Sequence, residues 1–119
     1  MLALLFSTLS LAATVDVTVQ VPDAEPISVI LPSLSDADAR SFLIEGHEQL
    51  WSFSVTLHAT GAGLYQLDCT LDTLEETRRG HLKRARVLAP RLTTRADQQA
   101  TVSVGEGAER FAVELVVTE

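Results

Sequence analysis

The chain has 119 residues and a formal net charge of −7, from 9 Lys and Arg against 16 Asp and Glu. This length predicts one independently folding domain and excludes a pair of full-sized domains. The acidic balance excludes non-specific nucleic-acid binding, because Lys and Arg that neutralise phosphates supply most of the affinity in that class of protein.

Residues 1–13 (MLALLFSTLSLAA) carry no charged side chain and run from an apolar stretch into small residues. This pattern is typical of an export signal, although the usual basic residues at its start are missing. The segment is shorter than the roughly 20 apolar residues that cross a bilayer as a helix. We therefore predict a signal peptide over residues 1–13 and a periplasmic or secreted domain over residues 14–119. The alternatives are a misassigned start codon and a buried first strand.

Alternation of apolar and polar residues predicts about seven short strands, since period-two patterning is typical of half-buried strands. They are expected at residues 14–21, 27–31, 51–58, 65–72, 82–88, 100–104 and 111–117. Between the second and third strands, Ser35 followed by Asp38 resembles a helix N-cap with an acidic first turn. This spacing predicts one short helix that continues through Ile44 and ends at Gly46.

The fold class follows from this order of elements. Short alternating strands with turn residues between them predict a mainly β protein, an antiparallel β-sandwich or rolled sheet. Pro90 cannot donate to a strand ladder, so the fifth strand is expected to lie at an edge there or to be interrupted by a bulge. The single cysteine, Cys69, excludes an internal disulfide. Its place on an apolar strand face predicts a buried, inert thiol.

The segment from residue 86 to 105, RVLAPRLTTRADQQATVSVG, is the most informative motif. It contains an apolar run, a proline, a Leu-x-Thr step, a Gln-x-Ala step and a closing Val-Gly, at Val87–Leu88, Pro90, Leu92 to Thr94, Gln98 to Ala100 and Val104–Gly105. In this order it resembles the signature segment of the bacterial secretin family, the outer-membrane channel proteins of type II and type III secretion and type IV pili. One departure is Ala96-Asp97, which replaces the family's Asp/Asn-Gly turn and predicts a looser loop.

The resemblance implies a role at the cell envelope, with partners among envelope or secretion-system proteins. It covers about a sixth of the chain, so it implies a stand-alone relative of the motif rather than a channel subunit. The family segment carries no catalytic residue, and none is transferred to this chain.

Positive charge is concentrated between Arg78 and Arg95. If the fourth and fifth strands pair with Thr70 opposite Arg84, then Asp68 lies opposite Arg86 and Asp72 lies near Arg84. Such opposite charges stabilise a sheet by roughly 0.2–1 kcal/mol each. On this interpretation the basic residues complement an acidic neighbouring strand. The candidate interaction surface, for anionic lipid headgroups or glycans, consists of Arg84, Arg86, Arg91 and Arg95.

The sequence contains few residues in patterns typical of metal-binding or catalytic sites. The three histidines are far apart in the sequence, and His47-Glu48 is a poor chelate because adjacent strand residues point to opposite faces. We therefore predict no metal and no cofactor. The sequence has no nucleophile elbow, phosphate-binding glycine loop or zinc signature, which predicts a non-catalytic protein. His58 and Asp68 both lie on polar strand faces and are expected to meet across the third and fourth strands.

Two functional hypotheses remain. The first is a non-catalytic, exported β-domain that acts as a binding or assembly module of the cell envelope. The alternative is a small periplasmic enzyme or ligand-binding protein with a polar site near His58 and Asp68. A pocket at that pair would favour the alternative, and a flat sheet with an exposed edge would favour the first. Membrane association and oligomeric state stay open.

Overall fold

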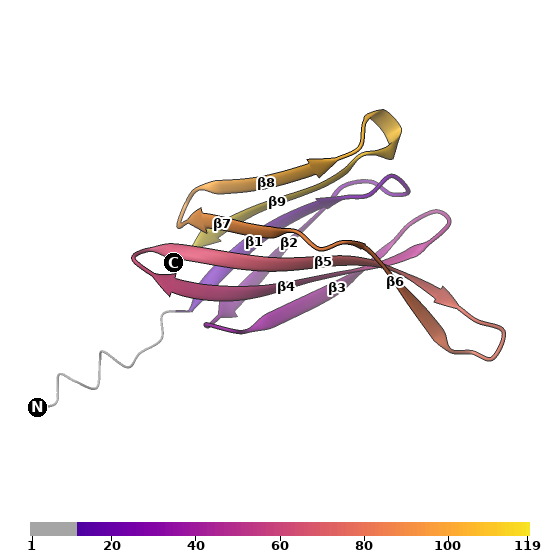
Figure 1. Cartoon of the computed structure of the whole chain (residues 1–119), viewed down its shortest axis with the longest axis horizontal. Helices are drawn as coiled ribbons and strands as arrows, with labels where there is room; N and C mark the ends of the chain where they lie inside the picture. The colour runs from indigo at the N-terminus through magenta and orange to yellow at the C-terminus, as the bar shows by residue number, and fades with distance from the viewer. Residues whose placement is uncertain (1–11) are drawn as a thin grey trace, which may run out of the picture.

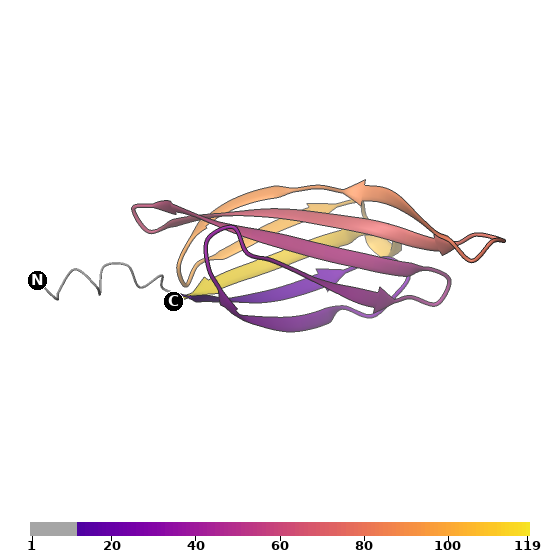
Figure 2. The same cartoon turned by 90° about the horizontal axis from the view of Figure 1, so that it is seen from below.

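The computed structural model describes residues 12–119, which form nine strands in two antiparallel sheets. The two sheets lie face to face (Figures 1 and 2). Buried apolar side chains from both sheets form one core between them. The predicted antiparallel β-sandwich is therefore confirmed. The expected signal peptide lies outside the described residues except for Ala12 and Ala13, and Ala13 is the first residue of the first strand. In residues 12–119 no helix is long and apolar enough to cross a membrane.

The first sheet has the order β2-β1-β9-β8. Its strands are β1 (Ala13–Gln20), β2 (Ile27–Leu34), β8 (Gln99–Val104) and β9 (Phe111–Thr118). A single turn of 3₁₀ helix, η1 (Gly107–Glu109), joins β8 to β9. The inward side chains are the alternating valines expected from the sequence, such as Val15, Val17 and Val19 on β1.

The second sheet has β3, β4 and β5 side by side, and both β6 and β7 pair with β5. Its strands are β3 (Ala39–Glu45), β4 (Leu50–Gly61), β5 (Leu64–Glu76), β6 (Leu82–Leu88) and β7 (Arg91–Arg95). Because β5 is long, β7 pairs with its first half and β6 with its second half. The chain passes from one sheet to the other at β2–β3 and again at β7–β8.

The helix predicted from Ser35 to Ile44 is wrong, because this region is a turn followed by strand β3. Asp38 N donates to Ser35 O at 3.0 Å and the Asp38 carboxylate accepts a hydrogen bond from Ser35 N at 2.8 Å, which closes a tight turn. Ala37 has a φ of 69°, which a helix cannot accommodate. The turn carries the chain from one sheet to the other, and Phe42 and Ile44 then face the core as alternate residues of a strand.

Residues 86–105 span the end of β6, all of β7 and all of β8. The expected break at Pro90 is confirmed, since β6 ends at Leu88 and β7 begins at Arg91. A bulge at Val87, opposite Leu71 and Asp72, precedes this break within β6. The two strands on either side of Ala96-Asp97 belong to different sheets, β7 pairing with β5 and β8 with β9. The turn between them is therefore a corner of the sandwich, with Asp97 at a φ of 65°.

The core confirms most of the predicted strand faces. Phe53, Leu57, Leu67 and Leu115 are buried between the sheets. Trp51 is buried as well, whereas Phe111 is only half-buried at the end of the sandwich, where its ring meets the Trp51 ring edge-on with centroids 5.8 Å apart.

Candidate functional site

The hairpin between β5 and β6 projects beyond the rest of the sandwich, at the lower right of Figure 1 and at the right of Figure 2. We call residues 75–86 the arm. β4 pairs with β5 only as far as Leu74, so beyond that point the arm is a two-stranded ribbon. A tight turn closes it: Gly80 N donates to Thr77 O at 3.0 Å, and Thr77 N donates to His81 O at 2.7 Å.

The register of this ribbon corrects the sequence-based pairing. Arg86 lies opposite Asp72 rather than Asp68, and Arg84 lies opposite Leu74 rather than Thr70, a shift of four residues. The turn is tighter than expected, because Thr73 to Glu76 continue β5 instead of forming a loop. A shift of four is even, so Arg84 and Arg86 keep their predicted outward face, whereas the bulge beyond Arg86 leaves Val87 exposed and packs Leu88 against the core.

Asp72 holds two arginines at the base of the arm. Its Oδ2 accepts a hydrogen bond from Arg84 Nη1 at 2.9 Å, and its Oδ1 accepts one from Arg86 Nε at 2.7 Å. The Asp72 side chain is only 1% exposed, whereas the two arginines are 55% and 56% exposed. One buried carboxylate therefore orients two guanidinium groups that remain open to solvent, and the cluster keeps a surplus positive charge.

The pKa of Asp72 reflects these contacts. Burial alone would raise the pKa, but the hydrogen bonds from Arg86 and Arg84 outweigh burial and hold the pKa below its usual value. The carboxylate is thus ionised at neutral pH, and the pair of arginines is held in place as a permanent feature of the surface.

The remaining basic residues of the arm are fully open. Arg78, Arg79 and Lys83 are exposed, and within the described part of the chain no ion pair involves them. Leu82 is also 65% exposed. The arm is not purely basic, since Glu75 lies opposite Lys83 in the ladder.

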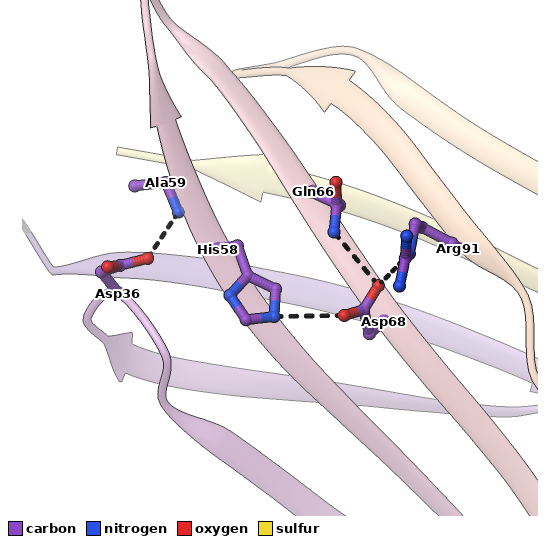
Figure 3. A network of polar contacts seen from close by, with 6 residues as sticks. All are labelled: Asp36, His58, Ala59, Gln66, Asp68 and Arg91. Carbon is purple, nitrogen blue, oxygen red and sulfur yellow. Dashed lines mark hydrogen bonds and ion pairs between the residues drawn. The ribbon is translucent and has the colours of Figure 1, made fainter.

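A second polar cluster lies on the outer face of β4, β5 and β7 (Figure 3). His58 Nε2 lies 3.1 Å from Asp68 Oδ2, which confirms the predicted contact. Arg91 Nε donates to Asp68 Oδ1 at 2.9 Å, and Gln66 Nε2 lies 3.4 Å from the same oxygen. His58 and Asp68 sit diagonally across the ladder and are 37% and 34% exposed. Both Asp68 oxygens therefore have partners, and the cluster lies on an open sheet face.

The four arginines of the predicted interaction surface all face outward, spread along the length of β5. Arg84 and Arg86 contact Asp72 at the base of the arm, Arg91 contacts Asp68 farther along β5, and Arg95 lies opposite Leu64 at the far end of β5. The structure thus brings Arg84 and Arg86 together and separates them from Arg95.

An open groove of about 570 Å³, which the sequence did not indicate, lies where the loops at Pro22, Glu48 and Glu109 meet. Its wall includes Asp23, whose carboxylate accepts hydrogen bonds from Glu48 N at 3.0 Å and Gln49 N at 2.8 Å. The Glu48 amide is the main reason that the pKa of Asp23 lies below its usual value. The buried Trp51 indole N–H is close enough to lower this pKa further, but falls short of a regular hydrogen bond. The only sequence signal was an aspartate after Pro22 in a loop.

His47, Glu48 and Cys69 were the other residues considered for metal binding or reactivity. His47 and Glu48 belong to the turn that Asp23 holds, and the region covering residues 12–119 has no group of three or more His, Cys, Asp or Glu placed to bind a metal ion. Cys69 is buried, as predicted, and burial raises the pKa of its thiol to about 12. Its thiol is therefore neutral and shielded.

No protein-family model matches the chain, and no curated protein or solved structure is significantly similar to it.

Proposed function

We propose that this chain is a non-catalytic binding module of the cell envelope, and that its arm recognises an anionic group on the partner. The observation that carries the proposal is the pair of arginines held by the buried Asp72 at 2.9 and 2.7 Å while each stays more than half exposed. Export is the part of the proposal that rests on residues 1–13 alone.

Preorganisation supports this role for Arg84 and Arg86. An arginine that is already fixed loses little side-chain entropy when it binds, so more of the interaction energy appears as affinity. A guanidinium group also presents a planar set of donors that matches a carboxylate or a phosphate. The two arginines have one carboxylate between them, which leaves donors on both for an external anion.

Charge segregation supports the same interpretation. The whole chain is acidic, with a net charge of −7, yet Arg78, Arg79, Lys83, Arg84 and Arg86 all lie on the arm or its base. An acidic protein with one local basic surface repels anions elsewhere and directs them to that surface.

Retention on a carboxylate cation-exchange resin at pH 7 tests the proposal. We expect the protein to be retained at low salt despite its negative net charge, and the Arg84→Gln/Arg86→Gln variant to be retained much more weakly. The matched control is Arg40→Gln/Arg110→Gln, which removes the same charge from exposed arginines outside the arm. Absence of retention, or an equal loss in both double variants, would contradict an anion-binding arm.

A second candidate, a small periplasmic enzyme or ligand-binding protein, is favoured by the contact of His58 with Asp68. Against it, Arg91 and Gln66 occupy the other Asp68 oxygen, and the pair lies on an open face of the sheet. A ligand whose binding is lost in both His58→Ala and Asp68→Asn, but kept in Arg84→Gln/Arg86→Gln, would establish this candidate instead.

A further inference from the structure

The outer edge of β6 is an open strand edge. β5 occupies one side of β6, and no other strand between residues 12 and 119 pairs with its second side. Every residue from Leu82 to Val87 is exposed. Because the arm extends beyond β4, both faces of the ribbon are also open there.

The ladder geometry identifies which backbone groups face this open side. Thr77 N donates to His81 O, so this pair belongs to the hydrogen-bonded positions of the antiparallel ladder. Hydrogen-bonded and non-hydrogen-bonded positions alternate along an antiparallel ladder. By the register, the backbone N–H and C=O groups of Lys83 and Ala85 therefore also point toward β5. The N–H and C=O groups of Leu82, Arg84 and Arg86 consequently point away from β5, as a row of donors and acceptors that no strand within residues 12–119 pairs with.

We propose that this edge binds an extended acidic segment of a partner protein, which adds to the sheet as a further strand beside β6. The inference rests on the anion-binding role of the arm and names its partner. A strand laid along the edge receives backbone hydrogen bonds from Leu82, Arg84 and Arg86. Asp or Glu at alternating positions of that strand would meet the outward side chains of Arg84 and Arg86.

Charge selects this occupant over a second copy of the chain. Two β6 edges side by side would bring Lys83, Arg84 and Arg86 against the same residues of the other copy, and like charges across a ladder are destabilising.

The edge of the other sheet at β2 differs, since it carries Pro32 and no charged residue. Proline blocks strand addition, whereas the β6 residues 82–88 include no proline and keep every backbone donor.

The test uses the full chain and a short synthetic peptide of alternating Glu and Thr. We expect saturable binding, and slower hydrogen exchange at the amides of Arg84 and Arg86 in the complex. Leu82→Pro removes one outward N–H without changing charge, and should weaken binding by about tenfold, the usual effect of one lost hydrogen bond. The matched control Leu82→Ala removes the exposed side chain but keeps the N–H, and should bind nearly as the parent does.

The outcomes separate this inference from the proposed function. Peptide binding that is lost in Arg84→Gln/Arg86→Gln but unchanged in Leu82→Pro, with fast exchange at both amides, would overturn strand addition and leave anion binding intact. Equally tight binding of an acidic peptide interrupted by prolines would overturn strand addition in the same way. Binding to vesicles containing phosphatidylserine but not to the peptide would identify a membrane partner instead. Failure of both peptide binding and resin retention would overturn the proposed function as well.

Discussion

Tyr65 at the start of β5 donates a hydrogen bond to the Glu119 carboxylate, just after β9, and so ties the two sheets together at the end opposite the arm. This bond, followed by burial and the nearby negative charge, raises the pKa of the phenol to about 12. The neutral phenol is therefore favoured in the folded protein relative to the unfolded chain.

The raised pKa of Tyr65 predicts that the protein loses stability in strong alkali. Because the folded pKa lies above the unfolded value of about 10, the contribution is complete below pH 10 and is lost as the pH rises toward 12. The chain has one tyrosine, so the increase in ultraviolet absorbance that accompanies phenolate formation comes from Tyr65 alone, against a Trp51 absorbance that does not titrate. Glu119→Gln should move the titration to lower pH, and an unchanged titration curve would contradict the bond.

Asp72→Asn is expected to lower the free energy of unfolding by about 1–3 kcal/mol, because Arg84 and Arg86 lose an ionised partner that is buried. Denaturation by urea at neutral pH measures the change. Asp16→Asn is the control, since Asp16 is an exposed aspartate on β1. Equal stability of the two variants would mean that the Asp72 cluster contributes nothing to the fold.

The same carboxylate predicts an acid dependence. The pKa of Asp72 is lowered in the folded protein, so its stabilising effect is present above the unfolded pKa of about 4 and is lost as the pH falls below that value. The difference in stability between the parent and Asp72→Asn should therefore shrink on acidification. A difference that stays constant down to strongly acidic pH would refute the assignment.

Asp23 is expected to hold the turn between β3 and β4 in its observed conformation. Its carboxylate accepts the backbone N–H groups of Glu48 and Gln49, so Asp23→Ala should speed hydrogen exchange at these two amides. The lowered pKa of Asp23 predicts that acid has the same effect as the substitution, once the carboxylate is protonated. Glu25→Gln, in the same loop, is the matched control. Exchange that is equally slow in Asp23→Ala would show that the β3–β4 turn holds its shape without this carboxylate.

Export of the chain is predicted from residues 1–13, and cleavage after Ala13 would leave Thr14 as the first residue. Intact-mass measurement on fractionated cells decides this. If the protein keeps Met1 and stays in the cytoplasm, the proposed location at the cell envelope is wrong. The proposed anion binding by the arm does not depend on this result.

Residue spacing along the chain was enough to assign the side chains that face inward. A strand alternates its side chains with a period of two, so Val15 to Val19 and Leu67 to Leu71 could be assigned to the core from their spacing alone. The contact of His58 with Asp68 followed from the same logic, because a short glycine turn aligns β4 and β5. These features depend on local geometry, which neighbouring residues dictate.

Three features could be determined only from the tertiary structure. They are the pairing register of β6, the path of residues 35–45 and the burial of Asp72. A shift of four residues leaves Arg84 and Arg86 on the same face, so alternation cannot distinguish Asp68 from Asp72 as the residue opposite Arg86. Ser35 and Asp38 form a turn instead of a helix cap, because the chain there must cross to the other sheet, where Phe42 and Ile44 face the core. The open edge of β6 likewise depends on which strands reach β5, a long-range property that no local pattern encodes.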